Sequence, residues 1–169
     1  MTNKHLTFAI FGNSFQPRKS QSLMRVLDFL RSKGASIIFD RTFYDFLTAE
    51  QNQELGNVGT FDGDDFNADY VISMGGDGTF LKAAVRVGIK SIPLIGINMG
   101  RLGFLADVLP GEVESALQAV LEGNYNIEEH TAIQISTSGG DFDGCHYALN
   151  DIAVLKRDIA SMIGIHTSI

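Results

Sequence analysis

The residues with the clearest chemical potential form one turn, Gly75–Gly78, which has the sequence GGDG. Glycine lets a backbone come close to a ligand, and the first N–H groups of a following helix have no partner within that helix. A turn of this kind binds phosphate groups. The carboxylate of Asp77 would repel a bare phosphate, so it suits a sugar hydroxyl or a phosphate-bound Mg²⁺ better. The turn therefore suggests phosphoryl transfer to a hydroxyl.

The same turn also has a purely structural interpretation, in which Asp77 or Thr79 caps a helix and the glycines serve turn geometry. A second stretch, residues 98–105, favours the ligand site. It again places glycines and an amide side chain, that of Asn98, just after an apolar strand. Ligands of open parallel sheets bind at this end of the strands. The phosphate-binding candidates are Gly75, Gly76, Gly78 and Thr79, and the second stretch adds Asn98, Gly100, Arg101 and Phe104.

Lys82 is a further candidate, because it lies in the first turns of the helix that follows GGDG. A cation at that position could contact a phosphate bound at the helix N-terminus. Lys82 and Arg86 are four residues apart and therefore neighbours on one helix face, which is usually only a solvated face. Asn13 follows the first strand, and we interpret it as turn chemistry.

The elements that must position these residues are alternating strands and helices. Apolar runs predict strands at 6–11, 35–39, 70–74 and 93–97, and helical spacing predicts helices at 20–33, 79–87 and 110–122, with Gly34 and Gly123 as C-terminal caps. A strand, a helix and a strand in succession require parallel pairing with a right-handed crossover. Residues 1–122 therefore predict an α/β nucleotide-binding domain with a parallel sheet.

Two stretches before the central turn have weaker patterns. Residues 42–55 could hold a helix, and residues 56–68 are polar and rich in Gly and Asp. The acidic cluster at 62–65 lacks the spaced ligands and final Glu of an EF-hand calcium loop. We therefore expect this acidic cluster to lie in a solvated surface loop.

The pattern changes after Gly123 to short alternating runs at 131–136, 146–155 and 162–169. Residues 123–169 therefore predict the beginning of a β-rich second domain, too short to close a sandwich, so we expect the chain to stop inside it. Asn150 and Asp151 are neighbours in one of these runs, and on a strand their side chains point to opposite faces. Asn150 could bind a ligand, or it could belong to a hairpin turn.

Composition limits the partners. The chain has 13 basic and 20 acidic residues, a formal charge of -7, and so lacks the basic footprint of a nucleic-acid binder. One cysteine, Cys145, excludes an intramolecular disulfide and Cys-cluster zinc sites and indicates a reducing compartment. The four histidines lack metal-binding spacing. No apolar run approaches the length of a membrane span. We expect a soluble, cytoplasmic protein without nucleic-acid or membrane partners.

Three motifs together resemble the NAD kinase family: GGDG at 75–78, N-x-G-x-L-G-F-L at 98–105 and Asn-Asp at 150–151. GGDG alone also occurs in diacylglycerol and sphingosine kinases and is similar to a motif of phosphofructokinases. The order and spacing of the three motifs agree with the NAD kinase family over nearly the whole chain. The combination is therefore specific.

The resemblance implies phosphorylation of the 2′-hydroxyl on the adenosine ribose of NAD, with ATP and Mg²⁺ or another divalent cation, to give NADP. It assigns the general base to Asp77, the NAD site to Gly78 and Lys82, and the adenosine contacts to Asn150 and Asp151. It also implies a homodimer or homotetramer. A lipid kinase that shares GGDG and a non-catalytic dinucleotide-binding fragment are the alternatives.

Two departures from the family pattern stand out. His130 lies where the family commonly has an Arg, and the Gly-Ser-Thr-Ala-Tyr segment that completes the dinucleotide site is absent from this chain. From the second departure we expect that this chain alone is an inactive part of an active enzyme.

Overall fold

The computed structural model describes residues 5–12, 20–50, 52–100, 103–139, 146–149, 151–153, 162 and 164–168. Four residues singled out above lie outside these ranges: Asn13, Arg101, Cys145 and Asn150. The chain divides into two compact units, Met1–His130 and Thr131–Ile169. The first unit extends past residue 122, and within it the hydroxyl of Tyr125 lies 3.0 Å from the hydroxyl of Tyr70.

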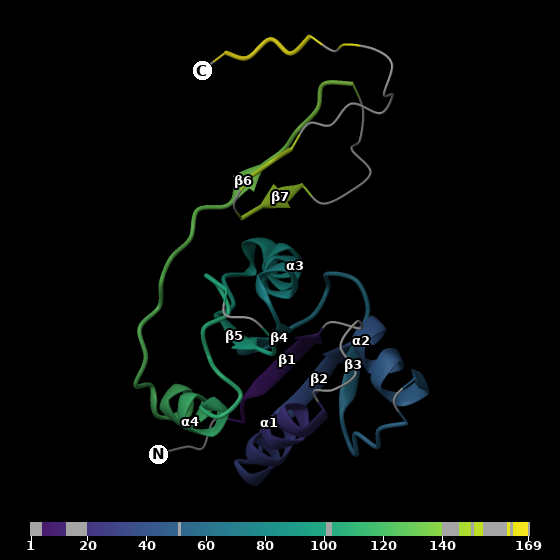
Figure 1. Cartoon of the computed structure of the whole chain (residues 1–169), viewed down its shortest axis with the longest axis vertical. Helices are drawn as coiled ribbons and strands as arrows, with labels where there is room; N and C mark the ends of the chain where they lie inside the picture. The colour runs from purple at the N-terminus through teal and green to yellow at the C-terminus, as the bar shows by residue number, and fades with distance from the viewer. Residues whose placement is uncertain are drawn as a thin grey trace. The chain divides into compact units, whose positions relative to one another are not determined.

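The first unit is an α/β domain built on a parallel sheet. Its strands are β1 (Thr7–Gly12), β2 (Ser36–Asp40), β3 (Gly59–Phe61), β4 (Tyr70–Gly75) and β5 (Leu94–Asn98). Its helices are α1 (Ser20–Ser32), α2 (Arg41–Asp45) with the π-helical turn η2 (Phe46–Glu50), α3 (Asp77–Val87) with the 3-10 turn η3 (Gly88–Lys90), and α4 (Val113–Glu122). The strand order is β3-β2-β1-β4-β5, and every pair is parallel (Figure 1). The predicted α/β fold is confirmed.

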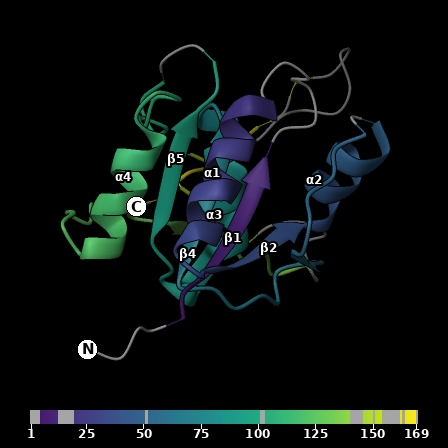
Figure 2. The same cartoon turned by 90° about the horizontal axis from the view of Figure 1, so that it is seen from below.

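The helices cover both faces of the sheet. Helices α1 and α4 lie on one face and α3 on the other (Figures 1 and 2). The helix after β1 and the helix after β4 therefore leave neighbouring strands toward opposite faces, which makes the gap between β1 and β4 a topological switch point. Open α/β sheets bind ligands at the carboxyl ends of the strands beside such a point. The GGDG turn follows β4 directly.

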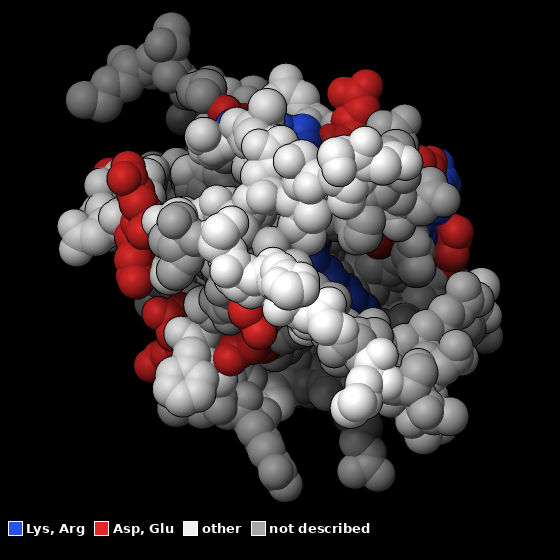
Figure 3. Space-filling view, turned by 90° about the horizontal axis from the view of Figure 1, so that it is seen from above, with Lys and Arg blue, Asp and Glu red and all other residues white. Residues whose placement is uncertain are grey.

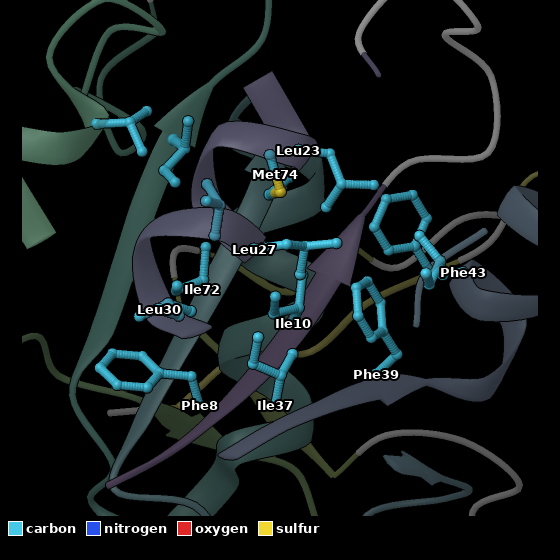
Figure 4. Packing of buried hydrophobic residues seen from close by; sticks show 14 of the residues in the cluster. Phe8, Ile10, Leu23, Leu27, Leu30, Ile37, Phe39, Phe43, Ile72 and Met74 are labelled. Atoms are coloured by element: carbon cyan, nitrogen blue, oxygen red, sulfur yellow. The ribbon is translucent and has the colours of Figure 1, made fainter. Parts of the chain in front are cut away.

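The larger core cluster fills the α1 face of the sheet. The apolar stripe of α1, Leu23, Leu27 and Leu30, packs on the side chains of β1, β2 and β4 (Figure 4). The opposite face has a smaller cluster, in which Ala83 and Val87 of α3 pack with Ala9, Phe11, Phe61, Phe66 and Val71. Each burial of a large apolar side chain contributes about 1.5–3 kcal/mol. Packing therefore fixes the C-terminal half of α3 against the sheet.

The polar stretch 56–68 contains a strand, because Gly59–Phe61 forms the edge strand β3 beside β2. Phe61 and Phe66 are buried, with ring centroids 4.5 Å apart. These two aromatic side chains anchor the segment in the core. The glycines and aspartates around them make the segment look like a loop in the sequence. Residues 62–65 are exposed, as expected.

The helix predicted at 110–122 begins later, at Val113, because Pro110 lies in a turn closed by the bond from the Glu112 N–H to the Leu109 carbonyl. Gly123 ends the helix with a left-handed φ of 71°. Gly34 follows α1 with the same φ. Both predicted glycine caps are therefore confirmed, and each needs glycine for its conformation.

The second unit contains a short antiparallel pair, β6 (Ile133–Gln134) with β7 (Tyr147–Ala148). A small β-sheet thus begins where the sequence predicts one, but its strands are much shorter than the predicted runs. The described residues of the run 162–169 form no strand. None of the described residues of this unit is buried, so the short strands have no core to extend them.

Acidic side chains appear at several places on the face in Figure 3, and basic side chains at fewer, in keeping with the formal charge of -7. Among the helices of the described ranges, none is long and apolar enough to cross a membrane.

Candidate active site

The GGDG turn joins the end of β4 to the start of α3. Gly75 is the last strand residue, Gly76 is the N-cap, and Asp77 is the first helical residue. The Gly76 carbonyl accepts hydrogen bonds from the N–H groups of Thr79 (2.9 Å) and Phe80 (3.1 Å). No side chain caps the helix, so the interpretation of Asp77 or Thr79 as the N-cap is wrong.

The glycines of this turn differ in what the fold requires of them. A Cβ atom at Gly75 would lie less than 3.0 Å from the buried side chain of Thr79, so Gly75 is needed for packing. At Gly76 and Gly78, an added Cβ would meet no atom of the described residues within 4 Å, and neither residue has a left-handed φ. Neither packing nor conformation requires glycine at these two positions. The space above them is open to a ligand.

Asp77 accepts hydrogen bonds from the backbone of a distant loop. Its Oδ2 accepts from the N–H of Phe104 (2.8 Å), and its Oδ1 accepts from those of Leu105 (3.0 Å) and Ala106 (3.2 Å). The bonds from Phe104 and Leu105, with that from Ala106, hold the pKa of Asp77 below its ordinary value. Asp77 therefore remains a carboxylate at neutral pH.

The loop that supplies these N–H groups leaves β5 and returns to it. Val108 forms a parallel bridge to Ile97 of β5. Asn98 is 1% exposed, and it fastens both ends of the loop, because its Oδ1 accepts from the Gly100 N–H (2.8 Å) and its Nδ2 donates to the Ala106 carbonyl (3.2 Å). Asn98 was predicted as a ligand contact, but in this structure its amide holds the loop.

A backbone hydrogen bond also joins this loop to the GGDG turn, because the Met99 N–H donates to the Gly75 carbonyl at 2.9 Å. Gly96 on β5 lets the loop come close, because a Cβ there would lie 2.7 Å from the Cα of Ala106. The loop is therefore fixed against both β5 and the GGDG turn.

Other predicted site residues are accessible. Lys82 is exposed in the second turn of α3. Phe104 has a fully exposed ring, although its N–H is bonded to Asp77. Gly100 is exposed at the start of the loop, and Asp151 is exposed in the second unit. The structure thus brings Asp77 together with the backbone of the 98–105 motif and leaves Lys82 and Phe104 free to meet a ligand.

The neighbour of Lys82 on the same helix has a different role. Arg86 donates to Asp40 at 3.0 Å and forms an ion pair with Asp64. Its guanidinium also lies over the rings of Phe11 and Phe61, 5.5 and 6.0 Å from their centroids. Arg86 therefore ties α3 to β2 and to the segment after β3, and does not form a solvated pair with Lys82.

Sequence reasoning missed the backbone N–H groups of residues 104–106. The signal that could have found them is Gly103, the glycine that precedes Phe104, because a Cβ at that position would collide with the Asp77 carboxylate. No cluster of three or more His, Cys, Asp or Glu side chains in the described part of the chain could hold a metal ion.

Known proteins with similar sequences identify the family of this chain. Residues 8–125 match the family described as the ATP-NAD kinase N-terminal domain. The chain is 47% identical to the NAD kinase of Bacteroides fragilis over 164 residues, covering 97% of this chain and 57% of that protein. It is 35% identical to the NAD kinase of Porphyromonas gingivalis over 158 residues, covering 94% and 54%.

Among solved structures, the yeast NADH kinase complexed with NADH has the same fold, with a TM-score of 0.69 at 16% identity. The match covers 88% of this chain and 48% of that one. The chain thus spans little more than half the length of the curated relatives it matches. Since the family match covers most of the first unit and includes GGDG, the chain belongs to the NAD kinase family and contains its ATP-NAD kinase N-terminal domain.

Proposed function

We propose that the protein containing this chain transfers the γ-phosphoryl group of ATP to the 2′-hydroxyl on the adenosine ribose of NAD, giving NADP and ADP. The observation that carries the proposal is the carboxylate of Asp77, held by three backbone N–H groups between two glycines that the fold does not require. The relatives named NAD kinase supply the substrate class.

Asp77 is the residue that faces the hydroxyl. A carboxylate has about four lone-pair positions, two on each oxygen. The bonds from Leu105 and Ala106 use both positions on Oδ1, and the bond from Phe104 uses one on Oδ2. The bonds made by the described residues leave the second position on Oδ2 unused, and we assign it to the ribose hydroxyl. Asp77 can thus orient that hydroxyl and accept its proton, an effect typically worth about 10² to 10⁴ in rate.

The bond changes follow from this arrangement. The ribose oxygen forms a bond to the γ-phosphorus while the bond from that phosphorus to the β,γ-bridging oxygen breaks, and ADP leaves. The hydroxyl proton passes to Oδ2 of Asp77 and then to solvent. The lowered pKa of Asp77 makes it a weak base, so we infer that proton transfer accompanies formation of the new bond rather than preceding it.

The phosphates of Mg-ATP would lie over the open start of α3. The free N–H groups at the helix N-terminus and the space above Gly76 and Gly78 suit an anion. Lys82 is exposed on the same helix and could reach a phosphate. Thr79 differs, because its N–H is bonded to the Gly76 carbonyl and its side chain is buried. We therefore assign the phosphate contact to Gly76, Gly78 and Lys82 in preference to Thr79.

The remaining assignments rest on the sequence alone. Phe104 would contact the nucleotide with its exposed ring, and Asn150 with Asp151 would contact adenosine. The divalent cation that accompanies ATP, the cytoplasmic location and the homo-oligomeric state also stay predictions. The matches to NAD kinases give no support to the lipid-kinase alternative.

The test is NADP formation from NAD and Mg-ATP, measured with this chain and with the protein completed to the length of its relatives. We expect product from the completed protein, and none when ATP is omitted. Diacylglycerol in place of NAD should give no phosphorylated lipid. NAD binding without turnover in the completed protein would refute the kinase proposal and favour a non-catalytic binding module.

A further inference from the structure

We propose that Gly103 is a positioning residue for Asp77: the absence of a side chain at position 103 leaves the space that the carboxylate occupies while it is bonded to the 104–106 backbone. The structural part of this inference stands by itself. Its kinetic part rests on the proposed function, in which Asp77 faces the ribose hydroxyl.

The requirement for glycine at position 103 is one of space. A Cβ atom built on Gly103 would lie less than 3.0 Å from both carboxylate oxygens of Asp77 and from its Cγ, separations that real Cβ atoms essentially never show. Gly103 has no left-handed φ, so its backbone conformation is open to other residues. Outside residues 102–104, the three atoms nearest to such a Cβ all belong to Asp77. A side chain at 103 would therefore act on Asp77 first.

The loop cannot easily move aside to accommodate a side chain. Ala106 is fully buried, its carbonyl accepts from Asn98, and its Cα packs against Gly96. The Asp77 side chain, in contrast, can rotate about two bonds and is only partly covered. An alanine at 103 would therefore displace the carboxylate rather than the loop.

Displacement of the carboxylate would misplace the one free lone-pair position on Oδ2. A misplacement of about 1 Å at a reacting group can cost about 10²-fold in rate. We therefore expect Gly103→Ala to lower kcat by about 10²-fold, with a smaller effect on the KM for NAD. The reason is that the contacts made by the rest of the dinucleotide are unchanged.

A double-mutant cycle in the completed protein tests the inference. The variants are Gly103→Ala, Asp77→Ala and the two together, and Gly111→Ala is the control because a Cβ there meets nothing within 4 Å. The measurements are kcat for NADP formation and the urea midpoint of unfolding. In the Asp77→Ala background the carboxylate is gone, so the added methyl group should cost nothing further in either measurement.

Three results would overturn the inference. Equal losses from Gly103→Ala with and without the Asp77 carboxylate would show that glycine serves the backbone and not Asp77. A Gly103→Ala variant with unchanged kcat and midpoint would show that the space is not needed. If Gly103→Ala fails to fold, recovery of folding in the double variant supports the inference, and failure in both overturns it.

The stability measurement separates the two proposals. If the completed protein forms no NADP, the proposed function fails, but the urea midpoints of the four variants still report whether Gly103 acts through Asp77. The effects of the two substitutions on the urea midpoint could depend on each other while their effects on kcat do not. That result would limit the role of Gly103 to folding.

Discussion

The two ends of α3 each hold one charged side chain with several contacts, but the partners differ in kind. At the start of the helix, Asp77 is held by backbone N–H groups. At the end, Arg86 is held by Asp40 and Asp64, which carry the opposite charge, and by the Gly63 carbonyl.

This difference determines what each charge can do. Backbone N–H groups are neutral, so Asp77 keeps its full negative charge and one lone-pair position for a further donor. Arg86 is neutralised by its carboxylate partners, and its guanidinium lies over aromatic rings. We infer that the first arrangement presents a charge to a ligand, whereas the second uses a charge to fasten the helix. Substitutions at the two ends should therefore have different effects.

The largest effect should come from Asp77→Asn. We expect kcat for NADP formation to fall by about 10² to 10⁴, because the amide can neither accept the hydroxyl proton nor keep the carboxylate charge. The KM for NAD should change much less. The measurement is steady-state kinetics, with the far-UV circular dichroism spectrum as a check of the fold. Unchanged turnover would remove Asp77 as the base.

Arg86→Met should have the opposite profile. Asp40 has a side chain only 13% exposed, and losing the arginine would leave it without this partner. Hydrogen bonds to charged groups contribute about 1.5–3 kcal/mol, so we expect unfolding free energy to drop by about 2 kcal/mol. Turnover per folded molecule should stay near the original value.

Arg41→Met is the matched control for Arg86→Met. Arg41 pairs with Asp62 at 3.4 Å, and both side chains are well exposed. An exposed pair of this kind is worth about 0–1 kcal/mol, so its loss should hardly change the urea midpoint. If Arg86→Met were as mild as Arg41→Met, the view that Arg86 fastens α3 would be wrong.

A glycine substitution separates ligand space from packing within the GGDG turn. Gly78 lies in α3 with open space above it, so Gly78→Ala should stabilise the helix by up to about 1 kcal/mol. The same methyl group would enter the space proposed for phosphate, so the KM for Mg-ATP should rise. Gly75→Ala should instead lower the urea midpoint, because its Cβ would collide with Thr79. Stabilisation without any loss of ATP affinity would contradict the proposed phosphate position.

The parts of the fold that sequence predicts are those with a long repeating pattern. The apolar stripe Leu23, Leu27 and Leu30 predicts α1, and continuous apolar runs predict β1, β2, β4 and β5. Strand β3 has three residues between glycines and aspartates, and it is a strand because β2 offers it a partner. That partner is set by tertiary structure, which no local pattern contains.

The candidate site likewise has one part that local sequence predicts and one part that it does not. GGDG and its place between a strand and a helix follow from local sequence, since glycines and an apolar run define them. The bonds to Asp77 come from residues 27 to 29 positions further along the chain, through backbone atoms that every residue has. Arg86 and Asp40 are 46 positions apart. Contacts made by backbone atoms across such separations leave little trace in residue type, apart from the glycine that makes room for them.

The smallest effect should be one of pH. The pKa of Asp77 is lower in the folded chain than its ordinary value of 3.8, because the N–H groups of Phe104 and Leu105 favour the charged form. The unfolded chain therefore takes up the proton first as the pH falls. The stability that Asp77 contributes is present above the ordinary pKa and is lost as the pH falls below it.

The Asp77→Asn variant tests this pH effect at the start of α3. The difference in urea midpoint between the original chain and Asp77→Asn should be largest near neutral pH and should shrink as the pH falls below about 4. It should shrink because protonation makes Asp77 as neutral as the amide. A carbon-13 titration of the Asp77 carboxyl group would give the same pKa directly. A midpoint difference that stayed constant down to acidic pH would mean that the bonds from residues 104–106 do not depend on the charge, and the contrast with Arg86 would then be one of geometry alone.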